Sequence, residues 1–376
     1  MATRYLVNGE YGAYVNNTDF WSETSGGTSG ASLPTKDDDV VIDDNSGFDA
    51  YDILFVQASS SYTVMRCKDL TVSVTGSRQV TFYGYYDESS YSVPDVYIWC
   101  YGNCTLNSTC QNGHIWLFFR GTSAKQLTTG GALLWHLELV NDATLTLQDD
   151  LTHTLFTDNG GDISINDGTF DHNGQDVFVG TYYGAGGSID FGSGTLTIAA
   201  SLDVSYTTND FGTCTIKAAS TDGMQGPYGY ACTLLFLDGT TIPHVEITKT
   251  NAGVYLSTDA NPATVTFGSF AFTSGAHMYF SPGCTYEFSA APVQNGDTDD
   301  LTYLDNLAPG LEENSIWSCA SNVTIENLSI VRNDAEGGGT FRATGEDSVE
   351  DEYTTGWIIG DVVSSARPQL LLMMVG

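Results

Sequence analysis

The sequence predicts an all-β chain folded as a β-solenoid, in which short strands stack coil upon coil. Gly (41), Tyr (21) and Phe (18) are abundant while Lys and Arg total only 12, a composition typical of strands and turns. From about residue 52 to 290, apolar or alternating runs of about five residues recur roughly every ten residues, separated by Gly, Asn, Asp and Thr. That stretch is too long for one ordinary β-sandwich, and small residues dominate its corners, so stacked coils are favoured.

The elements follow in order along the chain. Residues 1–50 are expected to form a Gly-rich N-terminal cap or attachment segment, with a first strand at Val40-Val41-Ile42 after a run of aspartates. Residues 51–290 are the expected solenoid body. Its clearest coil is 194–205, where apolar residues alternate strictly around a minimal corner. No fixed repeat period is found, so the repeat pattern by itself only suggests a solenoid.

The C-terminal part is expected to be a β cap region over residues 291–366, with a small β-sandwich-like character. Residues 291–320 are rich in Pro, Gly and Asp and predict a loop or crossover. Val323–Val331 predicts one strand pair, and Gly356–Ile359 a closing strand. Residues 367–376 form an apolar docking tail for a partner's groove or sheet edge, with the alternative that they fold back onto their own core. The docking side chains are Leu370, Leu371, Leu372, Met373, Met374 and Val375.

The charge balance excludes some partners. A net charge of −34 and a pI near 4.1 repel phosphate backbones and anionic lipid, which argues against nucleic-acid binding. The acidity fits either solubility or attraction to cations and basic partner surfaces. No apolar run is long enough to span a bilayer, so membrane insertion is not expected, and no apolar stretch follows Met1 as in a secretory signal peptide. We therefore expect synthesis in the host cytoplasm.

No cofactor is predicted. The eight cysteines include no Cys-x-x-Cys pair and most lie in apolar strands, which predicts buried free thiols rather than a zinc site. The oxygen-rich turns 43–47 and 297–300 leave a weak Ca²⁺ alternative, although neither has EF-hand spacing.

Three groups of residues resemble predicted phage and bacterial β-helix virion proteins. The opening of such chains is similar to Tyr5…Val7-Asn8-Gly9, Trp21-Ser22, the run 25–30, Pro34 and Asp38-Asp39-Val40. A repeated coil of that group resembles residues 168–180, and its closing motif resembles Thr354-Thr355-Gly356-Trp357. The chain departs from the pattern where Tyr5 replaces a Trp and Asn8-Gly9 a glycine pair. The resemblance implies a right-handed parallel β-helix in a virion or adhesin protein and carries over no catalytic residue.

No catalytic signature is present, so the chain is not expected to be an enzyme. A glycan hydrolase or lyase activity stays open, because two carboxyl groups suffice for glycoside hydrolysis. Five aspartates could line one face of a solenoid: Asp162, Asp167, Asp171, Asp176 and Asp190. Four aromatic side chains could stack on sugars, the alternative being core or interface packing: Trp99, Trp116, Tyr182 and Tyr183.

The first functional hypothesis is a structural virion component: a tail spike or tail fibre that is expected to form a homotrimer and to act in host attachment or tail assembly. The alternatives are a capsid decoration or head-fibre protein and a polysaccharide-degrading spike. A bacterial surface adhesin is disfavoured by the missing signal peptide. The expected partners are further copies of the chain, other tail or capsid proteins and host surface glycan.

Overall fold

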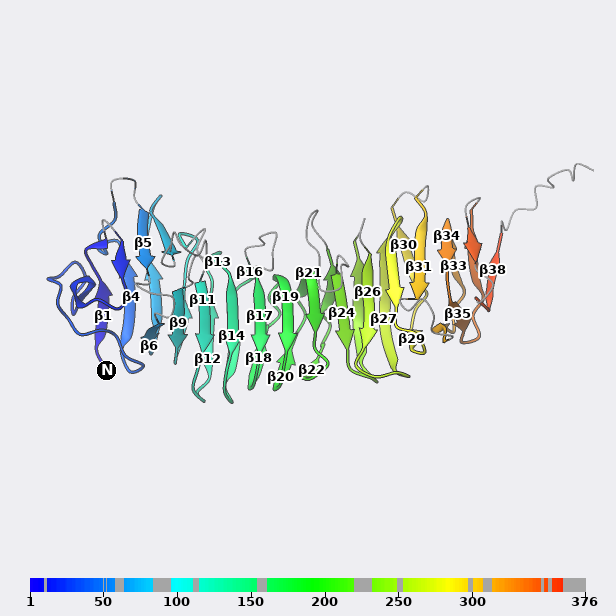
Figure 1. The fold of residues 1–376 in the computed structure, drawn as a ribbon, viewed down its shortest axis with the longest axis horizontal. Coiled ribbons are helices and arrows are strands. Elements are labelled where there is room, and N and C mark those ends of the chain that lie inside the picture. Colours follow the sequence, from blue (N-terminus) through cyan, green and yellow to red (C-terminus); the bar gives the residue numbers. More distant parts are fainter. Residues whose placement is uncertain are drawn as a thin grey trace, which may run out of the picture.

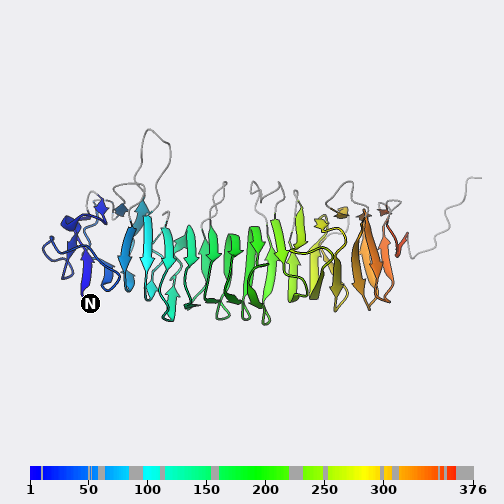
Figure 2. The same ribbon diagram turned by 60° about the horizontal axis from the view of Figure 1, so that its bottom comes forward.

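A computed structural model of the 376-residue chain is an elongated all-β rod, with strands lying across its long axis and β1 and β38 near opposite ends (Figure 1). The view turned by 60° shows the same stack of coils (Figure 2). The structure describes residues 1–9, 12–49, 51, 53–57, 64–83, 96–110, 115–153, 161–219, 232–248, 253–296, 300–306, 313–345, 348–350 and 354–360. No helix in this described part is long and apolar enough to cross a membrane. The predicted parallel β-helix is confirmed.

Strands from successive coils pair in parallel and form ladders along the rod. The first ladder contains ten strands, of which only the β1–β3 pair is antiparallel. Its order is β3 (Trp21–Ser22), β1 (Thr3–Leu6), β4 (Asp39–Asp43), β7 (Leu70–Ser73), β10 (Cys104–Thr105), β12 (Lys125–Thr128), β15 (Thr144–Leu147), β18 (Thr169–Asp171), β20 (Ser188–Asp190) and β22 (Thr208–Asp210).

The second ladder runs along most of the rod and is called here the long sheet. Each of its strands pairs in parallel with the next. Its order is β6 (Val64–Cys67), β9 (Val96–Cys100), β11 (Ile115–Phe119), β14 (His136–Leu139), β17 (Asp162–Ile165), the second halves of β19 (Val177–Gly184) and β21 (Thr195–Asp203), β24 (Cys232–Phe236), β26 (Val254–Thr258), β28 (His277–Phe280), β31 (Thr302–Asn306), β34 (Leu328–Ile330) and β37 (Val349–Glu350).

The third set of strands completes each coil. It begins with β2 (Ala13–Tyr14), β5 (Ile53–Gln57), β8 (Gln79–Tyr83), β13 (Leu133–Leu134) and β16 (Leu151–His153). The first halves of β19 and β21 lead on to β23 (Thr215–Ala218), β25 (Thr241–Ile247), β27 (Thr264–Thr273) and β30 (Val293–Asn295). Toward the C-terminus follow β29 (Thr285–Phe288), β32 (Ser315–Cys319) and β35 (Asn333–Glu336), and a small parallel sheet of β33 (Val323–Glu326), β36 (Phe341–Thr344) and β38 (Trp357–Ile359). A short 3₁₀ turn spans Thr18–Phe20.

The core is one continuous cluster along the inside of the coils. Alternate strand residues point inward, so apolar side chains of equivalent positions stack on one another. Leu137, Ile163 and Tyr182 occupy one such line and are all fully buried. The rings of Phe191 and Phe211 stack with centroids 4.8 Å apart and planes 2° from parallel. All eight cysteines are buried and free, as predicted.

The small corner residues have a steric cause. A Cβ added at Gly168 would lie 2.3 Å from the Ala143 carbonyl oxygen of the coil before it, and one at Gly187 would lie 2.3 Å from the Gly168 carbonyl oxygen. Both glycines also have positive φ, 81° and 73°, a conformation that favours glycine. The coils therefore approach too closely at this corner for a side chain.

One expectation about the ends needs correction. The expected loop at 291–320 contains strands β30, β31 and β32, which continue the coils. The sequence concealed β31 because its inward positions include Asn306, which is buried and donates a side-chain hydrogen bond of 2.8 Å to the Glu313 carbonyl oxygen. The expected cap or attachment segment at residues 1–50 contributes β1 and β4, which pair in parallel within the first ladder. Tail residues 367–376 lie outside the described residues.

Candidate functional site

The outer side of the long sheet carries a concentration of aromatic and charged side chains near its N-terminal end. Because side chains alternate between the two sides of a strand, every second residue faces outward, and the parallel register stacks these residues into two columns. The first column is Tyr97, Trp116, His136, Asp162 and Thr181, and the second is Arg66, Trp99, Phe118, Glu138, Ser164 and Tyr183. These two columns, with Arg120, are called here the aromatic–acidic face.

The rings of this face pack against one another. The centroid of Trp116 lies 4.3 Å from that of His136 and 5.5 Å from that of Tyr97. Trp99 is flanked by two guanidinium groups, with the Cζ of Arg66 4.7 Å and the Cζ of Arg120 4.0 Å from its ring centroid. Arg66 lies in β6 and Arg120 directly follows β11, so the two arginines come from the coils on either side of β9. The aromatic side chains are therefore held rigidly by stacking and cation–π contacts.

Two carboxyl groups lie at the other end of the face. Nε2 of His136 stands 3.5 Å from Oε2 of Glu138, whose Oε1 accepts a hydrogen bond of 2.7 Å from the Asn166 side chain. Burial raises the pKa of Asp162 above its usual value, although the nearby His136 and a hydrogen bond from Thr181 partly oppose this. The face therefore combines a carboxylate held by partners with a carboxyl group whose pKa is raised by burial.

Several buried polar atoms of this face have no hydrogen-bond partner among the residues that the structure describes. They are Nε1 of Trp116, Nε of Arg120, Oδ1 of Asp162 and both ring nitrogens of His136. Nε2 of His136 has in addition the contact with Glu138 given above. Leaving a buried polar group unsatisfied costs about 1–3 kcal/mol, so native structures rarely do so without a reason. Donors and an acceptor beside stacked rings are the groups that a ligand rich in hydroxyls would use.

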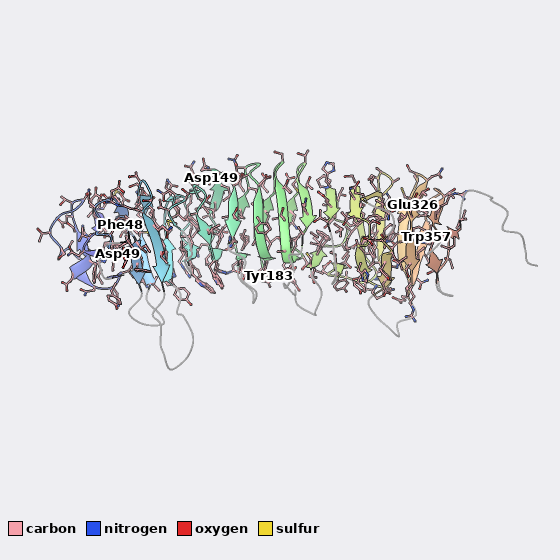
Figure 3. The ribbon with its side chains drawn as sticks, turned by 90° about the horizontal axis from the view of Figure 1, so that it is seen from above. Phe48, Asp49, Asp149, Tyr183, Glu326 and Trp357 are labelled. Carbon is pink, nitrogen blue, oxygen red and sulfur yellow. The ribbon has the colours of Figure 1, made fainter. Side chains whose placement is uncertain are left out.

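The predicted glycan-contact residues separate into two sets. Trp99 and Trp116 lie partly exposed on the aromatic–acidic face, and Tyr183 is 40% exposed at its edge. Tyr183 stands on the opposite long side of the rod from Asp149 (Figure 3). Tyr182 points into the core, is 0% exposed and shares a 3.0 Å hydrogen bond with Nε2 of His172. It is not placed to stack on a ligand, because adjacent strand residues point to opposite sides.

The five aspartates that could have lined one face do not come together. Asp162 alone lies on the aromatic–acidic face. Asp171 and Asp190 stack on the first ladder and accept turn hydrogen bonds from the backbone of Asn173 and Gly192. The carboxylates of Asp167 and Asp176 accept backbone hydrogen bonds of 2.8 Å and 2.7 Å from Gly168 and Thr195. These four therefore serve turns and coil contacts.

Sequence reasoning did not select Arg66, Arg120, His136 or Glu138. The available signal was alternation: in His-Leu-Glu-Leu, the two leucines face inward and the polar residues outward. Only the register of the long sheet shows that these residues meet Trp99 and Trp116.

The described residues contain no group of three or more His, Cys, Asp or Glu side chains that could hold a metal ion. In the 43–47 turn, Asp43 accepts a hydrogen bond from the Asn45 backbone, while Asp44 accepts two from Thr75 and pairs with Arg78. Residues 297–299 of the second calcium alternative lie outside the described part.

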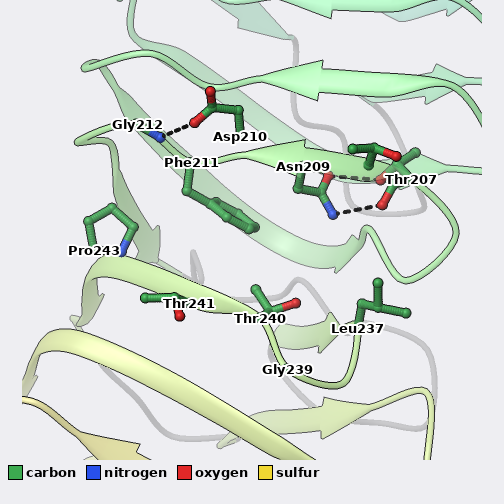
Figure 4. A pocket seen from close by; sticks show the side chains of 11 residues that line it. Thr207, Asn209, Asp210, Phe211, Gly212, Leu237, Gly239, Thr240, Thr241 and Pro243 are labelled. Atoms are coloured by element: carbon green, nitrogen blue, oxygen red, sulfur yellow. Dashed lines mark hydrogen bonds between the residues drawn. The ribbon is translucent and has the colours of Figure 1, made fainter.

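Away from the aromatic–acidic face, a hollow of about 550 Å³ opens where the first ladder stops at β22 (Figure 4). Phe211 and Asn209 line one side, and Thr240 and Thr241 the other. Here three polar side chains are engaged in hydrogen bonds: Asp210 accepts one of 2.9 Å from the Gly212 backbone, and Thr207 donates one of 2.8 Å to Asn209. The aromatic–acidic face is therefore the stronger candidate.

Comparisons with protein-family models, curated proteins and solved structures found no match for this chain. The aromatic–acidic face and the residue motifs of the sequence are therefore the features that bear on function.

Proposed function

We propose that this protein is a rigid β-helical rod that binds glycan on its aromatic–acidic face, as a tail-spike or tail-fibre component of a bacteriophage particle that acts in host attachment. The observation that carries the proposal is the concentration of stacked aromatic rings and unpartnered polar atoms on one flat side of the long sheet.

The chemistry of this face suits a saccharide. Sugar rings offer apolar C–H faces to aromatic side chains and hydroxyl groups to donors and acceptors. Trp99 and Trp116 supply the rings, and His136 and Asp162 the polar atoms. Strands in a sheet lie about 4.8 Å apart, so the six strands from β6 to β19 present a surface of about 24 Å. Such a surface has room for several sugar units in a row.

The virion assignment is supported by the resemblance of the motifs at 5–40, 168–180 and 354–357, and by the rod shape. Homotrimeric assembly and attachment to other tail proteins belong to the same proposal. Antibody labelling of purified particles in electron microscopy tests it: label at the tail is expected. Label over the head would replace it with capsid decoration, and no label on any particle would overturn it.

Glycan binding is tested with Trp116→Ala on an array of bacterial surface glycans. Loss of a central aromatic contact is expected to weaken binding about tenfold to thirtyfold. Tyr206→Ala is the matched control, because Tyr206 is 66% exposed in the turn before β22 and lies off the face. Unfolding midpoints of both variants show that the fold is kept. Equal binding by the two variants, or no binding by the wild-type chain, contradicts the proposal.

A second candidate function is cleavage of the bound glycan, and Asp162 is the observation that favours it. A carboxyl group with a raised pKa can donate a proton to a leaving oxygen, while a second carboxylate assists. Glu138 lies on the strand that pairs with the strand of Asp162, diagonally across from it. Diagonal neighbours in a sheet have Cα atoms about 7–8 Å apart. Release of reducing ends by the wild-type chain, abolished in Asp162→Asn, would support cleavage; binding without new reducing ends would exclude it.

A further inference from the structure

We infer that the glycan bound by this face is anionic, and that Arg66 and Arg120 bind its acidic group. The inference rests on the proposed glycan binding and specifies the class of ligand. The geometry behind it is a pair of guanidinium groups stacked on one tryptophan within a chain of very low cation content.

Cations are scarce in this protein, and five of the ten that the structure describes lie against carboxylates. The chain has 12 Lys and Arg against 46 Asp and Glu. The closest ion pairs in the described part are Lys68–Asp69 at 2.8 Å, Lys36–Asp37 at 2.9 Å and Arg78–Asp44 at 3.3 Å. In the same part, neither Arg66 nor Arg120 has a carboxylate within 4.0 Å; their contacts are with aromatic rings.

The stacking on Trp99 prepares both arginines for an anion. A guanidinium lying over a ring keeps its N–H edges available, and that planar fork matches a carboxylate with two parallel hydrogen bonds. The Nε of Arg120 has no hydrogen-bond partner within the described part of the chain. Because the two arginines come from the coils on either side of β9, they can approach one acidic group from two directions.

The other charged groups of the face fix where the anion lies. Lys68 is already paired with Asp39 and Asp69. Glu138 and Asp162 repel an anion, but they lie on β14 and β17. Strand β11 separates both of them from Trp99 on β9, where the two arginines lie. An acidic sugar is therefore expected at the Trp99 end, and neutral hydroxyl groups at the His136–Asp162 end. Since the whole chain repels anions, this attraction depends on direct contacts.

The test compares each acidic glycan with its own neutral form. Oligosaccharides of polygalacturonate, alginate, hyaluronan and polysialic acid are titrated calorimetrically beside their carboxyl-reduced counterparts. At least one acidic form should bind and lose tenfold or more of its affinity on reduction. Arg66→Gln and Arg120→Gln should each weaken the acidic form about tenfold or more, as expected for a hydrogen bond to a charged group, and weaken the neutral form by a clearly smaller factor.

Arg78→Gln is the matched control, because Arg78 also lies over a ring, with its Cζ 5.0 Å from the centroid of Phe48, but away from the face. Equal weakening by Arg78→Gln would make the effect one of net charge and overturn the inference. Equal binding of acidic and reduced forms would overturn it while leaving glycan binding intact, as would tighter binding of poly-aspartate than of any glycan. Failure of every acidic and neutral glycan, here and on the array, would instead remove the proposed function itself.

Discussion

The outer side of the long sheet contains two stretches that share a backbone and differ in chemistry. From β9 to β17 it carries Trp99, Trp116, His136 and Asp162, with buried polar atoms that no described group satisfies. From β26 to β28 the same positions form a closed network. Tyr255 Oη lies 3.2 Å and Ser257 Oγ 3.0 Å from Ser281 Oγ.

Tyr286, from the core of the coils, completes the network around Ser281. Tyr286 is fully buried, donates a 2.9 Å hydrogen bond to the Leu256 carbonyl oxygen and accepts one of 3.0 Å from the Ser281 backbone. The comparison shows that inward residues keep the coil alike in both stretches, whereas outward residues are free to differ. One stretch uses its polar groups in hydrogen bonds of its own, and the other has polar atoms without a partner among the described residues.

The largest expected effect is acid destabilisation of the coils that contain the buried His153 and His172. Burial lowers the pKa of His153 and of His172 to about 3. The unfolded chain therefore binds protons below pH 6.5 while the folded chain does not, and stability is lost as the pH falls from 6.5 toward 3. Between pH 7 and 4.5 the loss is about 2–3 kcal/mol for each histidine. Urea unfolding at a series of pH values measures it.

Hydrogen exchange, corrected for the intrinsic effect of pH, should show protection lost first around β16 to β19. The double variant His172→Phe with Tyr182→Phe removes both partners of one buried hydrogen bond and should make the pH dependence about half as steep. An unchanged slope in that variant, or equal loss of protection in β26 to β29, contradicts this distinction between the stretches.

An intermediate effect is expected from opening the closed network. Tyr286→Phe removes two buried hydrogen bonds but leaves the ring in place, so the free energy of unfolding should fall by about 1–2 kcal/mol. Glycan affinity should stay the same, because Tyr286 belongs to the other stretch. Denaturant unfolding and calorimetric titration measure the two quantities, and a change in affinity without a change in stability would break the comparison.

The smallest effect is a gain in stability from Asp162→Asn. The folded pKa of Asp162 lies above its unfolded value, so ionisation above about pH 4 destabilises the folded chain and protonation below that pH removes the penalty. Because this side chain is partly exposed, solvent screening limits the gain at pH 7 to under about 1 kcal/mol. Unfolding at pH 7 and at pH 3.5 should show the gain only at pH 7. A loss at pH 7 would mean that the carboxylate is paired after all.

The sequence by itself determined the fold class and much of the core. Alternating apolar residues, glycine-rich corners and the scarcity of cations are sufficient for stacked β coils, because burial and turn sterics act on residues close together in the chain. Trp99, Trp116 and Asp162 were recognised as residue types suited to a glycan. The sequence failed at β31, where buried Asn306 conceals the apolar alternation.

Only the tertiary structure decided which residues meet. Trp99 lies 33 positions from Arg66 and 21 from Arg120, yet all three share one ring contact, because coil length and register set the vertical neighbours of a strand. With unequal coil lengths and no fixed period, that register cannot be counted from the sequence. The same register turned Tyr182 inward and Tyr183 outward, since a shift of one residue exchanges the two sides of a strand.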